Sequence, residues 1–339
     1  ANPPYATYQP YQPFPQAPRR RVSGWRVLWG ILFGLSVLAN VGLFLLLVGT
    51  IVVLAGAGTG YGATVLRDGP RTSRIAVIDI EGIIDESQAD NVYRQLKAAR
   101  EDGSVKGVIV RVNSPGGTIS ASDRIYREIV NYRNEQGQPA VAFMQGLAAS
   151  GGYYASVACE EIIAEPTAIT GSIGVIMSHF VFQELLENKL GVQPVVLTKG
   201  QKKGWPSSFH APTDEEMAYL DSRLLEPAYQ RFVSVVKEGR QKVLSGDEVM
   251  KLADGSIYVA EEAMAVKLID KTGYLDDAIA TIKARVGIDE AQVIEYRRPL
   301  SFMDVLMAES KTSTSLLRLD QTKLLELGSP QVLYLWHAF

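Results

Sequence analysis

Residues 146–154 read Gly-Leu-Ala-Ala-Ser-Gly-Gly-Tyr-Tyr and follow an apolar, strand-like segment at 140–144. The glycine pair after Ser150 leads into a helix-like stretch at 153–159. A serine at a strand-to-helix turn has its hydroxyl lifted out of the sheet, and the N–H groups at the helix start can stabilise an oxyanion. The stretch therefore indicates either a nucleophile turn or a tight packing turn without chemistry.

A second glycine turn lies one βα unit earlier in the chain. The strand-like segment 108–112, Val-Ile-Val-Arg-Val, runs into Asn-Ser-Pro-Gly-Gly at 113–117. Proline followed by two glycines leaves backbone N–H groups free to point at an anion. Two such turns at successive strand ends indicate acyl-transfer chemistry, because one can carry the nucleophile and the other an oxyanion hole.

The sequence of the two glycine turns does not identify the general base, which can be a histidine or a lysine. No histidine has an evident acidic partner to orient it: His179, His210 and His337. A lysine can replace histidine where burial or a positive neighbour keeps its amine neutral. The segment 198–206, which follows strand-like residues 194–197, offers Lys199, Lys202 and Lys203. A Ser-His-Asp triad and a Ser-Lys pair are therefore alternatives at this point.

The chain resembles the signal peptide peptidases of the bacterial protease IV family. The resemblance is carried by Val-Asn-Ser-Pro-Gly-Gly at 112–117, Ala-Ala-Ser-Gly-Gly-Tyr-Tyr at 148–154 and Thr-Gly-Ser-Ile-Gly-Val at 170–175, in the family's order and spacing. It covers residues 74–285 of the chain. It implies a serine protease with a Ser-Lys dyad on an α/β, Clp-protease/crotonase-like fold of βαβ repeats with a parallel sheet.

The resemblance also implies roles for particular residues. Ser150 matches the nucleophile, and Gly117 matches the oxyanion-hole N–H, to which the N–H of Gly151 would add. Ser172 matches the serine that orients the lysine amine. The family resemblance further implies a homo-oligomer, an octameric ring, in which the lysine can come from a neighbouring chain. No cofactor and no metal are implied.

The family's lysine lies three residues after a glycine and shortly before a proline-containing stretch. Gly200 makes Lys203 the match, with Lys202 as the second choice and Lys199 as the third. The chain departs from the family pattern at Lys267, where glycine is typical. That departure bears on local packing or on subunit contacts rather than on the dyad.

The composition excludes several classes of protein. The chain has 339 residues, a net charge of −3 and no basic stripe, which argues against nucleic-acid binding. Its single cysteine, Cys159, rules out a disulfide within the chain. The sequence also shows neither a metal-ligand spacing of His, Asp and Glu nor a Walker-type phosphate loop.

The first part of the chain predicts a membrane anchor. Residues 1–26 form a Pro-, Tyr- and Gln-rich tail that ends in an arginine cluster, and residues 27–56 carry no charge. That run can cross a bilayer and is too long for an ordinary signal-peptide core. Arginines before the run and none directly after it favour a cytoplasmic N-terminus in a bacterial cell membrane, with an extracytoplasmic protease domain.

The remainder divides into a linker at 57–73, a protease domain at 74–285 and a C-terminal extension at 286–339. Strand patterns at 74–80, 107–112, 140–144, 161–164 and 194–197 alternate with helical patterns at 89–100, 120–134 and 179–190. A longer helical run follows at 213–241. Such a βαβ succession predicts a largely parallel sheet with helices on its faces. The apolar residues 331–339 are expected to dock as a terminal element or to lie extended in a substrate groove.

Residues and resemblance together predict a membrane-anchored serine endopeptidase that hydrolyses cleaved signal peptides and other short apolar peptides. Ser150 would attack the carbonyl and a neutral Lys203 would take its proton. One alternative with the same fold is a crotonase-like acyl-CoA enzyme, which would need no Ser-Lys pair. The other is an inactive membrane scaffold, against which the intact Ser150 and Lys203 argue.

Overall fold

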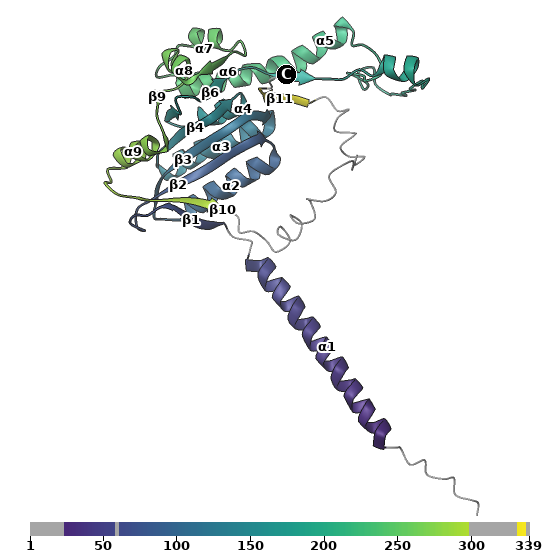
Figure 1. The fold of residues 1–339 in the computed structure, drawn as a ribbon. Coiled ribbons are helices and arrows are strands. Elements are labelled where there is room, and N and C mark those ends of the chain that lie inside the picture. The colour runs from purple at the N-terminus through teal and green to yellow at the C-terminus, as the bar shows by residue number, and fades with distance from the viewer. Residues whose placement is uncertain (1–23, 58–60, 298–330, 337–339) are drawn as a thin grey trace, which may run out of the picture. The chain divides into compact units, whose positions relative to one another are not determined.

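The structure is a computed structural model that describes residues 24–57, 61–297 and 331–336. The chain divides into two compact units between Ala57 and Gly58 (Figure 1). The predicted N-terminal tail and its arginines at 19–21 lie outside the described residues. The two units are considered separately below.

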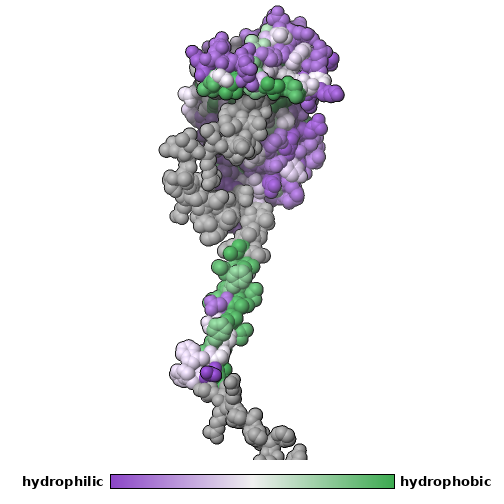
Figure 2. Space-filling view, turned by 90° about the vertical axis from the view of Figure 1, so that its right-hand side faces the viewer, coloured by the Kyte–Doolittle hydropathy of each residue, from purple (hydrophilic) through white to green (hydrophobic). Residues whose placement is uncertain are grey.

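The first unit is one long helix, α1 (Gly24–Ala57), as the uncharged run in the sequence predicts. Its segment Gly24–Ile51 is long and apolar enough to cross a membrane, by length and composition. Figure 2 shows the helix covered by hydrophobic side chains, and large apolar groups such as Leu38 and Leu46 are exposed along it. A helix that is apolar all round needs an apolar environment, which fits a membrane anchor or a signal sequence.

The second unit is built on a largely parallel sheet, which confirms the predicted α/β, Clp-protease/crotonase-like fold. Strands β10, β2, β3, β4, β5 and β9 run parallel, and β1 closes one edge antiparallel to β10. Their bounds are β1 Gly62–Arg67, β2 Arg74–Ile84, β3 Val105–Thr118, β4 Ala140–Ala149, β5 Glu161–Ala164, β9 Lys271–Thr272 and β10 Gln292–Arg297.

The central strands are buried on both faces, so they read as near-continuous β-branched runs. In β3, Val108 and Val110 join the core on one face of the sheet, and Ile109 joins the core on the other. Helices α2 (Glu86–Glu101), α3 (Ile119–Gln136) and α4 (Gly151–Ser156) cover the first face, and α9 (Leu275–Val286) covers the second (Figure 1).

Short strands extend the sheet at the carboxyl end of β4. Strand β6 (Ile169–Gly171) continues beside β4 in parallel, and β8 (Ile257–Val259) pairs antiparallel with β6. Strands β7 (Ile176–Ser178) and β11 (Gln331–Leu335) pair antiparallel with each other, and β11 also pairs antiparallel with β3. This end of the sheet holds both glycine turns of the sequence analysis.

The long helical run expected at 213–241 is present as consecutive helices. It consists of α5 (Asp214–Leu220), a π-helical turn (Asp221–Leu225) and α6 (Glu226–Arg240). A capping box formed by Thr213 and Glu216 starts it, as the polar residues before the run predict. Helices α7 (Gly246–Leu252) and α8 (Ala260–Ala265) follow and pack beside it.

The segment between β7 and α5, residues 179–213, is here called the arm. Figure 1 shows it as a projection that reaches past α5, away from the central sheet. The expected strand at 194–197 is wrong, because these residues are not assigned to a strand, they pair with no strand in the described part of the chain, and Leu197 is 93% exposed. The helix expected at 179–190 is reduced to a short turn that ends in a π-helix at Leu185–Lys189. Both patterns are apolar, but most of their side chains are exposed in the part of the chain that the structure describes.

Candidate active site

Ser150 stands at a strained turn between β4 and α4. Its φ of 54° and ψ of −114° lie in a region that serine rarely adopts. The turn is held by two backbone bonds, from Ser150 N–H to the Gly171 carbonyl and from Tyr154 N–H to the Ser150 carbonyl, both 2.8 Å. Strain of this kind costs about 1–3 kcal/mol and is typical of functional sites. The Ser150 hydroxyl forms no hydrogen bond to any residue that the structure describes.

The second glycine turn lies directly beside the first. In β3, the Ser114 hydroxyl accepts from the Gly116 N–H at 3.0 Å and donates to the Gly82 carbonyl at 2.6 Å, which fixes the shape of the turn. A Cβ on Gly116, whose φ is 100°, would lie 2.7 Å from the Gly151 nitrogen. Only glycine permits this approach, so the turns of Gly117 and of Ser150 meet at one place.

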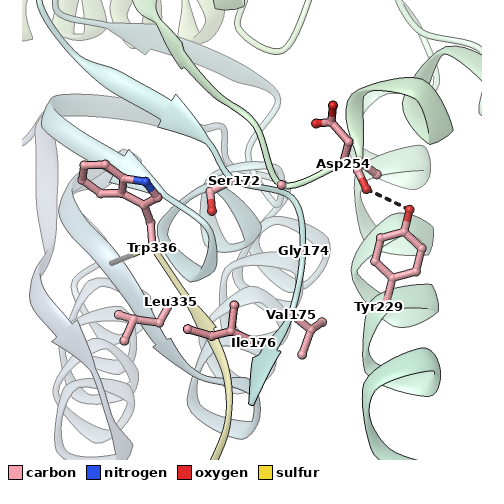
Figure 3. A pocket seen from close by; sticks show the side chains of 10 residues that line it. Ser172, Gly174, Val175, Ile176, Tyr229, Asp254, Leu335 and Trp336 are labelled. Atoms are coloured by element: carbon pink, nitrogen blue, oxygen red, sulfur yellow. Dashed lines mark hydrogen bonds between the residues drawn. The ribbon is translucent and has the colours of Figure 1, made fainter. Parts of the chain in front are cut away.

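Ser172 lies at the end of β6, one residue after the carbonyl that binds Ser150. Its φ is 52°, its N–H donates to the Ser256 carbonyl at 2.7 Å, and it is 8% exposed. A pocket of about 430 Å³ opens beside it, lined also by Ile176, Tyr229 and Trp336. Figure 3 shows the Ser172 side chain pointing into this space. Ser172 therefore lines a pocket that is open to solvent, and Ser150 is not among the residues that line it.

The candidate lysines lie on the arm, where no residue is fully buried. The Lys202 ammonium sits over the rings of Trp205 and Tyr219, 4.8 and 4.1 Å from their centroids, and 3.9 Å from a Glu215 oxygen. The Lys203 side chain is exposed and forms no ion pair or hydrogen bond within the described part of the chain. The Lys202 ammonium is therefore already engaged with Trp205, Tyr219 and Glu215, whereas the Lys203 ammonium can contact another molecule.

The structure brings Ser150, Gly151, Gly117 and Ser172 to adjacent turns and leaves Lys203 on the arm. Among the described contacts, none joins a candidate lysine or a histidine to Ser150. His179 and His210 lie on the arm as well, and His337 is outside the described residues. Among the residues that the structure describes, neither a triad nor a dyad is complete within one chain.

The C-terminal segment lies extended between β3 and β7. Tyr334 of β11 is paired with Gly117, and the N–H of Trp336 donates to the Pro115 carbonyl at 2.8 Å. The Tyr334 carbonyl oxygen would overlap a side chain at Gly116 and would lie 3.1 Å from a Cβ on Gly151. The tail thus docks on the protease domain as an extended strand, and its course across the two glycine turns fits a terminal element and a segment in a substrate groove alike.

Sequence reasoning missed the aromatic group beneath this strand. Tyr154 donates its hydroxyl to Asp123 at 2.6 Å, and Arg231 forms an ion pair with the same carboxylate at 2.7 Å. Burial opposes ionisation of Asp123, but the bonds from Tyr154 and Arg231 outweigh it and hold the pKa of the carboxyl below its usual range. The available signal was the position of Tyr154, one helical turn after Ser150.

Comparison with known proteins gives consistent matches. The profile of peptidase family S49 matches residues 132–289, and the profile of Clp protease matches residues 65–168. A candidate signal peptide peptidase SppA of Enterococcus faecium is 36% identical over 243 residues, which cover 68% of this chain and 69% of that protein.

Longer proteins match over part of their length. Protease 4 of Haemophilus influenzae is 36% identical over 214 residues, 61% of this chain and 34% of that protein. The chloroplastic serine protease SPPA of Arabidopsis thaliana is 32% identical over 238 residues, 69% of this chain and 34% of that protein.

Proposed function

The chain belongs to the S49 family of serine peptidases, and from that premise we propose that it is a membrane-anchored endopeptidase that hydrolyses cleaved signal peptides and other short apolar peptides. The observation that carries this proposal is the strained Ser150 turn, with its unbonded hydroxyl, in contact with the glycine turn of β3. A nucleophile and a set of backbone N–H donors are the parts that acyl transfer needs.

The proposed reaction uses residues of two turns and one lysine. The Ser150 Oγ attacks the peptide carbonyl while a neutral Lys203 amine takes its proton, with Ser172 orienting that amine. The N–H groups of Gly117 and Gly151 hold the oxyanion. Lys203 then gives the proton to the leaving amine. In the second half of the reaction, the neutral Lys203 amine takes a proton from water, the water oxygen attacks the acyl-enzyme carbonyl, and the proton returns to the departing Ser150 Oγ.

Lys203 is proposed to reach Ser150 from a neighbouring copy of the chain. The arm carries exposed apolar side chains, including Phe180 and Leu197, whose burial would favour association. The pocket that Ser172 lines is open to solvent. An arm whose lysines contact no described residue near Ser150, and an open pocket at Ser172, support a head-to-tail ring, which the family resemblance gives eight subunits.

The anchor is proposed to be α1. Its apolar residues would span a bacterial cell membrane, with the arginines before it in the cytoplasm and the protease domain outside. The proposed division of the chain is a tail at 1–26, a transmembrane helix at 27–56, a linker at 57–73, a protease domain at 74–285 and an extension at 286–339. An apolar β-strand seated across the glycine turns, β11, supports extended apolar peptides as substrates.

The test of the proposed function is labelling by a fluorophosphonate probe, followed by mapping of the modified residue. We expect the label on Ser150 in the assembled protein and none in Ser150→Ala. Ser120→Ala, which changes an exposed serine on α3, is the matched control and should label normally. Labelling that persists in Ser150→Ala would refute the assignment of the nucleophile.

A further inference from the structure

A second pocket of the protease domain is lined by α7 and by the end of α8 (Figure 1). Its volume is about 220 Å³, and it shares no lining residue with the pocket at Ser172. Its walls are largely apolar, because the buried Leu244 and the partly buried Leu252 and Val266 line it. Its charged lining residues are Glu248, Lys251 and Lys267. The proposed peptidase reaction uses none of these side chains.

Lys267 is the unexpected residue of this pocket. Its φ is 62°, and the family resemblance places glycine at this position. The Arg240 guanidinium donates to the Lys267 carbonyl at 2.8 and 3.0 Å, but glycine would present the same carbonyl at a lower conformational cost. The hydrogen bonds therefore explain the backbone and not the side chain. Strained backbone of this kind is typical of functional sites, and here it places an ammonium group at an apolar pocket.

The charges around the pocket favour an anion. Among the residues that the structure describes, the ammonium groups of Lys251 and Lys267 form no ion pair and no hydrogen bond. The Glu248 Oε2 accepts from the Ser245 N–H and from the Ser245 hydroxyl, both at 2.8 Å. These bonds, and to a lesser extent the charges of the two lysines, hold the pKa of Glu248 below its usual range. Two ammonium groups against one carboxylate leave an excess of positive charge.

The pocket also offers a hydrogen-bond acceptor. The Oε1 of Glu248 accepts no hydrogen bond within the described part of the chain. The last residue of an apolar peptide presents the three matching groups, which are an apolar side chain, a carboxylate and an amide N–H. A fatty acid has no N–H to donate. A volume of about 220 Å³ is below the roughly 300–1,000 Å³ of sites for drug-sized ligands, so it suits one terminal residue.

We propose that this pocket binds the free carboxylate end of apolar peptides, with Lys251 and Lys267 holding the carboxylate and Glu248 accepting the last amide N–H. The inference rests on the proposed function only for the source of the ligand, because each hydrolysis of a peptide bond leaves one product with a new C-terminal carboxylate. Binding itself requires no cleavage. The pocket would retain such products at a surface that shares no residue with the pocket at Ser172.

The test measures binding to the full-length Ser150→Ala protein in phosphatidylcholine nanodiscs, where the proposed nucleophile cannot consume a ligand. The probes are radiolabelled acetyl-Ala-Ala-Leu with a free carboxylate and the same peptide with a C-terminal amide, compared by equilibrium dialysis. We expect the acid to bind roughly 10-fold more tightly or better, the worth of a hydrogen bond to a charged group. Equal affinity for the acid and the amide would overturn the inference.

Variants of the two lysines locate the binding site. In the same background, Lys251→Gln and Lys267→Gly should each weaken binding of the acid by roughly 3- to 10-fold and leave binding of the amide unchanged. Lys267→Gly should also unfold at a higher temperature, because glycine relieves the strained φ, so its lost affinity cannot come from unfolding.

The matched control is Lys242→Gln, at an exposed lysine between α6 and α7 that does not line the pocket. It should bind the acid as tightly as the parent protein. An equal loss of affinity in Lys242→Gln would mean general attraction by positive charge and would overturn the assigned site.

Decanoate distinguishes a peptide from a fatty acid. It carries an apolar chain and a carboxylate but no group that can donate to Glu248, so we expect it to bind more weakly than the acid peptide. Tighter binding of decanoate that is lost in Lys251→Gln would overturn the choice of a peptide as the ligand.

The inference and the proposed function fail in different ways, because binding is measured without cleavage. Hydrolysis that depends on Ser150, together with equal binding of the acid and the amide, overturns only the site at α7 and α8. Binding of the acid that depends on Lys251 and Lys267, together with hydrolysis that persists in Ser150→Ala, supports this site and overturns only the proposed function.

Discussion

The backbone N–H of Ser150 donates to the Gly171 carbonyl at 2.8 Å, and this bond ties the strained turn of β4 to the end of β6. Because Ser172 follows Gly171, the same bond places the proposed lysine-orienting serine next to the proposed nucleophile. The strained turn at Ser150 is therefore held by the strand that ends directly before Ser172, a residue that lines the open pocket.

The first prediction separates the strain at Ser150 from its chemistry. Ser150→Ala and Ser150→Gly should both lose at least about 10³-fold in peptide hydrolysis, because each lacks the nucleophile. Ser150→Gly should be about 1 kcal/mol more stable than Ser150→Ala, since glycine adopts a φ of 54° without strain. Hydrolysis rates and thermal unfolding of the two variants measure both effects. Equal stability of the variants would mean that the turn is not strained.

The second prediction concerns the origin of the lysine. Lys203→Ala should be as inactive as Ser150→Ala, whereas Lys202→Ala should retain activity, because Lys202 is engaged with Trp205 and Tyr219. Co-expression of Ser150→Ala with Lys203→Ala should restore about a quarter of wild-type activity in mixed rings, where some sites combine an intact serine with a neighbour's intact lysine. Co-purification through two affinity tags isolates these rings for assay.

Two outcomes would contradict this prediction. Mixed rings without activity would place the lysine in the same chain as the serine. An inactive Lys202→Ala together with an active Lys203→Ala would move the base to the other lysine.

The third prediction is a pH dependence of stability through Asp123. The pKa of this carboxyl is lowered in the folded protein, so its contribution to stability is present above its unfolded pKa. That contribution is lost as the pH falls through the folded value. Asp123→Asn should therefore be less stable than wild type at pH 7, and the difference should shrink from about pH 5 downward. Thermal unfolding across this range measures it. Asp68→Asn, at an exposed aspartate, should show no such change.

The fourth prediction concerns Lys267, which stands where the family has glycine. Its φ is 62°, a left-handed conformation that glycine adopts without cost. Lys267→Gly should therefore raise the free energy of unfolding by about 0.5–1 kcal/mol. Lys283→Gly, in the last turn of α9, should lower it, because glycine is a poorer helix former than lysine. A loss of stability in Lys267→Gly would show that the lysine side chain makes a compensating contact.

Much of the sheet and both glycine turns could be predicted because local patterns decide them. The runs of β-branched residues in β2, β3 and β4 are buried on both faces, and the glycines occupy positions such as Gly116 where a side chain has no room. The departure at Lys267 was visible only through the family resemblance, which has glycine there, and the structure adds its positive φ.

The features that the sequence analysis did not predict depend on contacts between residues far apart in the chain or in different chains. Apolar residues 194–197 have the pattern of a buried strand, and the same pattern arises when a second copy is the partner. The pairing of Tyr334 with Gly117 joins segments more than 200 residues apart, and no local signal marks it. The Ala228 carbonyl, which accepts a hydrogen bond from the Tyr334 hydroxyl, belongs to the main chain. No residue type in the sequence could therefore have predicted this contact.

The last prediction concerns the C-terminal strand as a competitor. Because β11 lies across the glycine turns with the Tyr334 carbonyl at their meeting point, it would compete with a peptide for the proposed active site. A tethered segment has an effective concentration in the millimolar range. Deleting residues 328–339, or replacing Tyr334 with alanine in the full chain, should lower the apparent KM for short peptides by roughly tenfold or more, with kcat nearly unchanged.

A purely structural role for the strand leads to the opposite result. If Tyr334 serves only to anchor the tail on Tyr154 and Phe232, both changes should lower the melting temperature or break the oligomer, and KM should not fall. Melting temperature, native mass and KM measured on the same samples distinguish these outcomes. Val332→Ala, at a partly buried position of the same strand, is the control. It should change KM far less than Tyr334→Ala, because it leaves the Tyr334 ring between Tyr154 and Phe232 and the Tyr334 carbonyl at the turns.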